Sequence, residues 1–347
     1  MKRIPWDGLV SFGARLLQAK AVPEEAARCV AEIAVKTEAF GITTHGLVVL
    51  GNLAGRLGDD IDPAAQPSLV ADRGASAVIE GHNGIGQIAL HRAVQFALEN
   101  VQKYGTVTVA GRNVSWLGAL GIYLIPLAER GFLAQLWAQT ANCRDCAPWG
   151  GIDARFSTNP VALAFPTGGD PVIADFSTAA MSVGKASQLQ RAGRKAPERV
   201  FLDKQGRLTD DPNVMRDGGT MLFLGGEHFG YKGYALSLWC EAMTALAGGH
   251  CNNPDSPQRQ SFCLTAVMPE AFAGRGHYDE EMRRFIAHVR SSRLREGFDA
   301  IRLPGERGYR ALREARQRGV PVDDARLAQL QSLAGKLGVP WSLPVPC

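Results

Sequence analysis

Residues 156–178 read FSTNPVALAFPTGGDPVIADFST and contain two successive apolar runs. The first run, NPVALAFPT, is rich in β-forming residues, and the second, DPVIADFST, predicts a buried strand that ends at an acid, Asp175. A carboxylate at the end of a strand often acts in catalysis or binds hydroxyl groups, but it can equally cap the helix that follows. The stretch therefore predicts strands and leaves the role of Asp175 open.

Strand and helix patterns alternate on both sides of this stretch. Apolar or alternating residues predict strands over 106–113, 131–140 and 261–272, and a strand, a glycine loop and a long helix over 76–105. Helical spacing of apolar residues predicts further helices over 5–21, 23–41, 45–57, 230–249, 279–292 and 323–338. The helix over 230–249 is apolar on most sides, which is typical of a buried helix. An α/β fold follows.

The composition is that of an ordinary globular protein, with 46% hydrophobic and 21% charged residues among 347. This length predicts two lobes, and they are interleaved because no linker separates them. A net charge of +4 without any Lys/Arg-rich run argues against a nucleic-acid partner. Neither a signal-peptide pattern nor an apolar stretch of roughly 20 residues occurs, so we expect a cytoplasmic protein without a membrane partner.

The seven cysteines are odd in number and thinly spread, which indicates a reducing compartment rather than a disulfide framework. Cys143 and Cys146 have the C-x-x-C spacing that zinc sites and redox pairs share. A zinc site needs further nitrogen or sulfur ligands at suitable spacing, and no second C-x-x-C follows. We interpret the pair as free thiols in a loop and predict no metal site; metal or redox use is the alternative.

Two glycine-rich loops invite comparison with anion-binding sites. In EGHNGIGQIAL the glycines are spaced G-x-x-G-x-G, the reverse of the dinucleotide fingerprint, so a tight turn between strand and helix is the better interpretation. In GGTMLFLGGEHFGYKG, dense glycine surrounds Tyr231 and Lys232 at the start of a helix, where backbone N–H groups and a cation favour an anion. A surface lysine after a flexible loop explains the second pattern as well.

His45, in ITTHGLVVL, stands at the joint between two predicted helices. A lone histidine is most often a structural imidazole with satisfied hydrogen bonds. A position near a helix N-terminus should lower its pKa, and a neutral imidazole beside hydroxyl groups can still exchange a proton near neutral pH. A metal role is weakened because no second histidine stands at ligand spacing. The residues alone leave His45 between a structural and an acid–base role.

Several segments, in one order from about residue 38 to about residue 308, together resemble a known family: TEAFGITTHG, GHNGIGQ, APWGGIDARFSTNPVALAFPT, VIADFSTAAMSVGK, RAGRKAPE, DKQGRLTDDP, GGEHFGYKGYALSL and IRLPGER. They resemble the malate/L-lactate dehydrogenase-like NAD(P)-dependent oxidoreductases, which include sulfolactate dehydrogenases, ureidoglycolate dehydrogenase, diketogulonate reductase and piperideine-2-carboxylate reductase. The resemblance implies a non-Rossmann, sulfolactate-dehydrogenase-like fold with interleaved lobes. It also implies a homodimer, with the active site between the lobes and near the partner subunit.

The resemblance also implies roles for individual residues. His45 matches the histidine that donates a proton to the substrate oxygen or nitrogen as hydride reaches the adjacent carbon. Asn159 matches a position near the substrate pocket. The expected contacts of NADH or NADPH, which the sequence does not distinguish, are Pro171, Val172, Ile173, Ala174, Asp175, Phe176, Ser177, Tyr231, Lys232, Gly305, Glu306 and Arg307. A helical substrate lobe is expected over 1–75 and 266–347, and a cofactor-binding lobe over 76–265.

The sequence departs from the family pattern around the substrate. Family members have Ser-His-Gly-x-x-Arg, whose arginine suits a substrate carboxylate; here Thr44 replaces the serine and Val49 the arginine. A family histidine in the next pocket segment is Trp116 here. Arg144, in a loop that looks longer than usual, is a candidate replacement for the arginine. We therefore expect a larger, flatter or less acidic substrate than the usual 2-oxo acid.

These observations predict an NAD(P)H-dependent reductase that transfers hydride to the C=N or C=O carbon of a 2-imino or 2-oxo acid-like small molecule. A cyclic imine and a biosynthetic intermediate are candidates. The alternative is a catalytically altered family member that acts as a ligand-binding or assembly subunit. Val49 and Trp116 motivate the alternative, whereas the intact His45, Asp175 and Lys232 argue against it.

Overall fold

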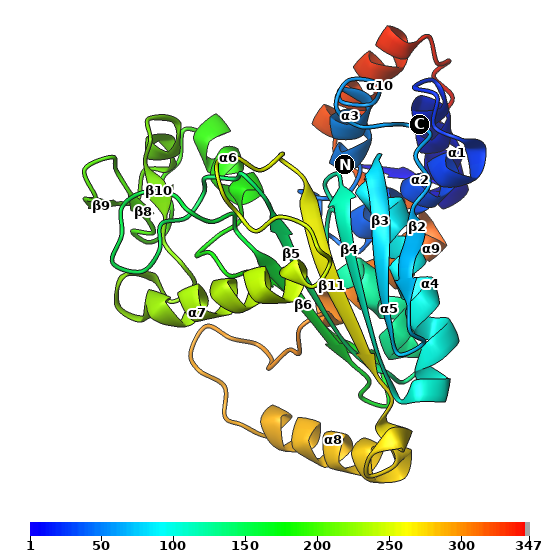
Figure 1. Ribbon diagram of the computed structural model, residues 1–347, viewed down its shortest axis with the longest axis vertical. Helices are drawn as coiled ribbons and strands as arrows, with labels where there is room; N and C mark the ends of the chain where they lie inside the picture. Colours follow the sequence, from blue (N-terminus) through cyan, green and yellow to red (C-terminus); the bar gives the residue numbers. More distant parts are fainter. Residues whose placement is uncertain (344–347) are drawn as a thin grey trace.

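A mixed seven-stranded sheet forms the centre of the computed structural model, which describes residues 1–343. Its strands lie in the order β2-β3-β4-β11-β5-β6-β7 (Figure 1). They span Ser68–Asp72 (β2), Ser76–Gly84 (β3), Thr106–Val114 (β4), Gln260–Val267 (β11), Leu133–Thr140 (β5), Pro160–Phe165 (β6) and Val172–Ser177 (β7). Only β3 and β4 pair in parallel among neighbouring strands of this sheet. The expected α/β fold without a Rossmann sheet is confirmed.

Both faces of the sheet are covered by helices, as the apolar strands require. Helices α4 (Gly86–Tyr104) and α5 (Gly121–Glu129) pack on one face, and α7 (Gly226–Ala245) packs on β5 and β11 from the other (Figure 1). Strand β5 illustrates the alternation: Leu136 belongs to the core beneath α4 and α5, whereas Trp137 packs with Cys240 of α7.

A second core joins the first and last helices of the described chain. Helices α1 (Trp6–Gln18), α2 (Glu24–Ala39) and α3 (Val48–Ala54) share a buried cluster with α10 (Asp324–Leu337). Strand β1 (Lys2–Ile4) pairs antiparallel with β12 (Val320–Val322), and α9 (Glu306–Arg318) packs on α2. Residues about 300 positions apart in the sequence thus form one helical lobe (Figure 1).

A third, smaller core lies between β7 and α7 in the chain. It contains α6 (Val183–Arg191), a three-stranded sheet of β8 (Phe201–Leu202), β9 (Leu208–Thr209) and β10 (Thr220–Met221), and the 3₁₀ helix η1 (Pro212–Arg216). Its centre holds Phe201, Phe223 and Cys146, all 2% exposed or less. This small lobe faces the helical lobe across the sheet edge (Figure 1).

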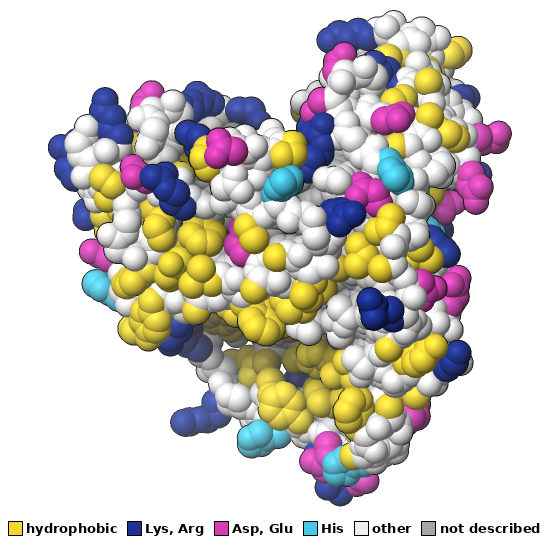
Figure 2. Space-filling model, viewed as in Figure 1, with side chains coloured by type: hydrophobic (Ala, Val, Ile, Leu, Met, Phe, Trp, Pro, Cys, Tyr) yellow, Lys and Arg dark blue, Asp and Glu magenta, His cyan; other side chains and the backbone are white. Residues whose placement is uncertain are grey.

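Two helices are far more exposed than the sequence led us to expect. Helix α7 was expected to be buried, yet Leu238, Trp239 and Leu246 are 47%, 54% and 59% exposed. Helix α8 (Arg275–Arg290), which follows the 3₁₀ helix η2 (Pro269–Ala271), contains no buried residue and stands away from the body. Apolar side chains line the space between the two helices (Figure 2). The prediction of a buried α7 is therefore wrong within a single chain.

None of the helices within residues 1–343 combines the length and the apolar character that crossing a membrane requires.

Candidate active site

The turn between α2 and α3 presents His45 to a cavity. Its imidazole is half-buried, and Nδ1 lies 2.7 Å from the Thr44 hydroxyl oxygen in a hydrogen bond. The ring of Trp116 packs beside it, with 5.1 Å between ring centroids. Burial lowers the pKa of His45, because desolvation disfavours the charged imidazolium. The predicted position of His45 at a joint between helices is confirmed.

A buried carboxylate supports this turn from below. Glu38, on α2, is 3% exposed, and its Oε2 accepts a hydrogen bond of 2.9 Å from the backbone N–H of Leu47. A Cβ atom at Gly46 would stand 2.2 Å from the same oxygen, so only glycine fits there. Burial raises the pKa of Glu38, although the Leu47 N–H opposes the shift. The hydrogen bond between Glu38 and Leu47 thus holds the turn against α2 and fixes the position of His45 within it.

The cavity in front of His45 has a volume of about 670 Å³ and lies between the three cores. One wall comes from the His45 turn and α3, a second from the ends of β5, β6 and β7, and a third from the start of α6. The walls approach closely, since a Cβ atom at Gly184 would lie 3.7 Å from Cβ of Thr44. Among the predicted residues, the lining includes Thr44, His45, Trp116, Asp175, Phe176 and Ser177.

Asp175 ties the end of β7 to a helix. Its Oδ2 accepts a hydrogen bond of 2.8 Å from the backbone N–H of Gly121, the first residue of α5. Burial raises the pKa of Asp175 to about 6, against the opposing effect of the Gly121 and Leu120 N–H groups. Asp175 therefore caps a helix, but not the helix that follows it in the sequence, and its carboxyl group also forms part of the cavity wall.

The fold brings two of the predicted cofactor segments together. The backbone N–H of Ile173 donates to the carbonyl oxygen of Pro304 over 3.0 Å, so residues 171–177 and 305–307 lie side by side. Gly305 has φ +96°, and a Cβ atom there would stand 3.1 Å from the nitrogen of Ile173. Glu306 and Arg307 then begin α9. Pro171, Asp170 and Arg313 line an adjoining surface cleft.

Tyr231 and Lys232 lie elsewhere. Both are exposed at the start of α7 and do not line the His45 cavity. The Tyr231 ring lies 6.0 Å from that of Trp149, and Nζ of Lys232 lies 5.3 Å from the ring centroid of Phe229. A single chain thus does not unite the YKG segment with β7 and α9.

The three remaining predicted pocket residues lie off the cavity wall. Val49 is 3% exposed in the core of the helical lobe, although Cγ2 lies 4.0 Å from where a Cβ of the wall residue Gly118 would be. Arg144 is exposed and does not line the cavity. Asn159 is fully buried, and its Nδ2 donates to Ser237 Oγ and Glu241 Oε1, each at 2.9 Å.

Asn159 nevertheless acts on the cavity through a chain of hydrogen bonds. The other oxygen of Glu241 accepts from the backbone N–H of Asn252 over 3.1 Å. The Asn252 side chain donates to the carbonyl of Cys143 over 2.6 Å and accepts from its N–H over 3.1 Å. This network holds the loop over 141–147, which carries two cavity-lining residues, Cys143 and Asp145.

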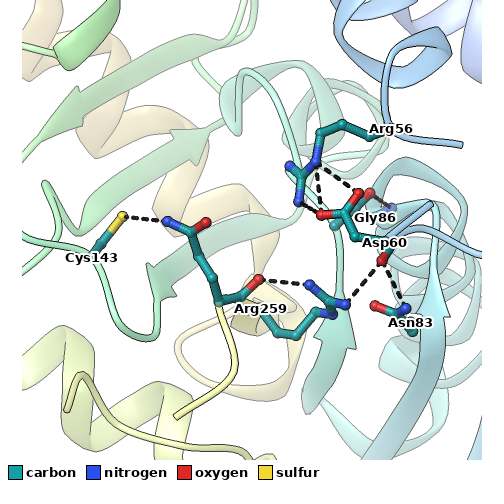
Figure 3. Close-up of polar contacts among 8 residues, drawn as sticks. Arg56, Asp60, Asn83, Gly86, Cys143 and Arg259 are labelled. Carbon is teal, nitrogen blue, oxygen red and sulfur yellow. Dashed lines mark hydrogen bonds and ion pairs between the residues drawn. The ribbon is translucent and has the colours of Figure 1, made fainter. Parts of the chain in front are cut away.

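A second tether joins this loop to the helical lobe (Figure 3). Gln258 Nε2 donates to Sγ of Cys143 at 3.7 Å, and the next residue, Arg259, donates to the carbonyl of Asp60 at 2.9 Å. Asp60 also forms an ion pair with Arg56. The segment before β11 therefore links opposite sides of the cavity.

Sequence reasoning missed several polar lining residues, namely Asn52, Asp145, Gln188, Gln260 and Arg326. Arg191 also lines the cavity; it lies in the basic segment QRAGRK, which the sequence marks as a charged exposed turn or as a contact for a cofactor 2′-phosphate. Gln260 joins two walls, since its Oε1 accepts from Leu117 N–H at 2.8 Å and its Nε2 donates to Thr140 Oγ1 at 2.7 Å. Arg326 belongs to α10, nearly 300 residues after His45, and no local pattern marks it. Asp145, inside the C-x-x-C loop, is the one of these five that a sequence pattern marks.

Cys143 and Cys146 are both free thiols, as predicted. Cys146 is fully buried, and burial raises the pKa of Cys143 to about 11, so neither is a ready thiolate. Within residues 1–343, no three His, Cys, Asp or Glu side chains are grouped as a metal site would need.

Comparison with known proteins agrees with this fold. The chain is 30% identical to a malate dehydrogenase of Pyrococcus abyssi over 97% of its own length and 95% of the relative's. It is 29% identical to a Δ1-pyrroline-2-carboxylate/Δ1-piperideine-2-carboxylate reductase of Pseudomonas putida, with 96% of each chain covered. The solved structure of sulfolactate dehydrogenase from Methanocaldococcus jannaschii superposes with a TM-score of 0.85 at 27% identity, covering 97% of this chain and 98% of that one.

Fold, site and relatives together define an NAD(P)-dependent oxidoreductase. The profile of the malate/L-lactate dehydrogenase family matches residues 4–331, nearly the whole sequence. The chain belongs to the malate/L-lactate dehydrogenase family, as its motifs indicated, and the sulfolactate-dehydrogenase-like fold is confirmed.

Proposed function

We propose that this protein is an NAD(P)H-dependent reductase of 2-imino or 2-oxo acids, with His45 as the proton donor. The observation that carries the proposal is the half-buried imidazole, fixed by Thr44 and Glu38 and facing a cavity beside β7. The relatives fit this class, since they include both a malate dehydrogenase and a cyclic imino acid reductase. A cyclic imino acid is our first candidate substrate, because Trp116 gives the cavity a flat aromatic wall.

The hydrogen bond to Thr44 suits a proton donor. With Nδ1–H donating to the Thr44 hydroxyl, Nε2 is the nitrogen that gives and regains a proton. NADH or NADPH, when bound, would supply the hydride for the substrate carbon, and the C=N or C=O π electrons would move to the nitrogen or oxygen. His45 Nε2–H would then protonate that atom, so that a ketone yields an alcohol, a neutral imine an amine and an already protonated imine an ammonium ion, and solvent reprotonates the imidazole.

The residues along β7 and α9 fit a dinucleotide. Gly305, the N-cap residue of α9, has no side chain to cap the helix. The N–H of Glu306 donates to Leu303 O at 3.3 Å, so the next two N–H groups, of Arg307 and Gly308, are the ones open to an anion. A cleft of about 610 Å³ beside this helix is lined by Gly168, Gly169, arginines and acids. Arg313 pairs with Asp170 and Arg290 with Glu306, whereas Arg283 and Arg310 form no ion pair within residues 1–343. Strand β7 leads from this cleft to the His45 cavity. We propose that the diphosphate binds at the start of α9 and the nicotinamide beside Asp175, Phe176 and Ser177.

Two measurements test this function. Fluorescence titration with NADH and NADPH should show binding of at least one, and the preferred cofactor should support reduction of pyruvate, oxaloacetate or Δ1-piperideine-2-carboxylate. Binding of neither cofactor would favour the alternative, a ligand-binding or assembly subunit. Cofactor binding with no turnover of any 2-oxo or imino acid would rule out the proposed reductase function.

We propose further that the protein acts as a homodimer. The exposed apolar residues of α7, with Phe285 of α8 at 58% exposure, form a surface larger than isolated apolar side chains would (Figure 2). A second copy of the same chain is the partner that matches this surface, because α8 stands clear of its own body and its face lies open. Such a partner would also lie near Tyr231 and Lys232.

A further inference from the structure

Asp145 presents a carboxyl group to the His45 cavity. Its backbone is fixed on both sides: the N–H donates to Phe156 O at 2.9 Å, and the carbonyl accepts from Met221 N–H at 2.8 Å. The next residue, Cys146, is fully buried in the core of the small lobe. Asp145 itself lines the His45 cavity rather than that core.

This carboxyl group has no cationic partner within residues 1–343. No arginine, lysine or histidine pairs with it there, and the Cys143 thiol is the only side chain that hydrogen-bonds to it. Burial without a counter-charge raises the pKa of Asp145 to about 6. A half-buried carboxylate costs free energy unless a partner meets it. A positively charged group of a ligand in the cavity is such a partner.

The opposite charge stands on another wall of the same cavity. Arg326, on α10, is half-buried, and its guanidinium hydrogen-bonds Gln329 Oε1 at 2.6 Å but pairs with no carboxylate of the described chain. Helix α10 packs on α3, so Arg326 lies on the wall that α3 shares with the His45 turn. Trp116 adds an aromatic face, which attracts cations. Arg191 also lines the cavity without an ion pair, Asp175 accepts from the Gly121 N–H, and the charge of Arg326 lowers the pKa of Glu38. Asp145 is thus the cavity acid that lacks both a cation and a backbone donor, and it faces a wall that carries the Arg326 guanidinium.

We propose that the substrate is zwitterionic, with its cationic nitrogen recognised by Asp145 and its carboxylate by Arg326. This inference rests on the proposed reductase function and narrows its substrates to protonated 2-imino acids and 2-oxo acids that carry an amino group. It disfavours dicarboxylates, because a second carboxylate would face Asp145. Val49 stands at the position of the arginine that the family pattern places against a substrate carboxylate. Arg326 fills that role here, and the exposed Arg144 does not.

The test compares two substrates in matched variants. The ratio of kcat/KM for Δ1-piperideine-2-carboxylate to that for oxaloacetate is measured in the wild type, in Asp145→Asn and in Asp153→Asn. Asp153 is exposed, pairs with Arg155 and does not line the cavity. Asp145→Asn should lower the ratio at least about tenfold, mainly through KM of the imino acid, and Asp153→Asn should leave it unchanged. Arg326→Gln should raise KM for both substrates.

Calorimetry separates this inference from the proposed function. L-pipecolate, a zwitterion, and L-malate are titrated into the enzyme saturated with oxidised cofactor. Tighter binding of L-pipecolate, lost in Asp145→Asn, supports the inference even if neither substrate is turned over, in which case only the reductase assignment fails. An unchanged kcat/KM ratio in Asp145→Asn, or tighter wild-type binding of L-malate, overturns the charge assignment and leaves the reductase intact.

Discussion

The ring of Trp116 lies against that of His45, with the two centroids 5.1 Å apart and the planes inclined by 44°. The indole therefore covers one face of the imidazole and shares in the burial that lowers the pKa of His45. Trp116 thus shapes both the surroundings of the proposed proton donor and one wall of the cavity.

Replacing His45 tests the proton donor directly. His45→Ala should lower kcat for reduction by about 10²- to 10⁴-fold, because the developing charge on the substrate atom is no longer neutralised. Cofactor affinity, measured by NADH or NADPH fluorescence, should change little. Near-complete activity in His45→Ala would mean that another group supplies the proton.

The rate of reduction should fall as pH rises. Reduction requires protonated His45, whose pKa lies below its ordinary value of 6.5, so kcat/KM should decline through a pKa below 6.5. Oxidation of the product requires the neutral imidazole and should rise through the same pKa. Asp145 and Asp175 both have a pKa of about 6, so their titration would also change the rate in this pH range. The control is His45→Gln, in which any pH dependence that remains is due to these carboxyl groups and not to His45. A decline that begins only above pH 7 would contradict this assignment.

Removing the indole should shift that profile. Trp116→Ala admits water to the imidazole, so the pKa of His45 should move up toward its ordinary value and the decline of reduction should follow it. Trp116→Phe keeps an aromatic cover and should shift the profile less. Equal pH profiles in the wild type and Trp116→Ala would show that other atoms desolvate His45.

The turn beneath His45 should tolerate no Cβ atom at Gly46. Gly46→Ala forces the Glu38 carboxylate away from Leu47 N–H, so we expect a loss of unfolding free energy of at least about 1–3 kcal/mol, together with reduced kcat. Gly51→Ala is the matched control, because that glycine lies in α3 with open space around it. Chemical denaturation of the two variants measures the difference. Equal stability of both would contradict the proposed support of the turn.

A charge on α7 should separate the proposed dimer. Trp239→Glu places a carboxylate on the exposed apolar face, and light scattering should then report the mass of one chain in place of two. Val70→Glu, on the edge strand β2 and at similar exposure, should leave the dimer intact. A wild-type protein that is already monomeric at assay concentration would remove the homodimer proposal.

Local patterns predicted most of the secondary structure but little of the cavity wall. Helix α2 repeats apolar residues with the helical period, β7 follows a short continuous apolar run, and His45 lies at the predicted joint. Asp175, by contrast, caps α5, which precedes it by more than 50 residues, and no local pattern marks that contact. Asp145 and Arg326 come together with His45 only through tertiary packing. Asn159 does not line the cavity and contacts the loop over 141–147 only indirectly, through Glu241 and Asn252.

The pairing of β1 with β12 also orders events during synthesis. Residues 2–4 can pair only after residues 320–322 have been synthesised. Helix α10, which packs in the same core and carries Arg326, follows directly after β12. A nascent chain on the ribosome therefore holds His45 in an unfinished lobe until residue 337 has left the exit tunnel. Until then the cavity lacks the wall that carries Arg326, however much of the central sheet has already assembled.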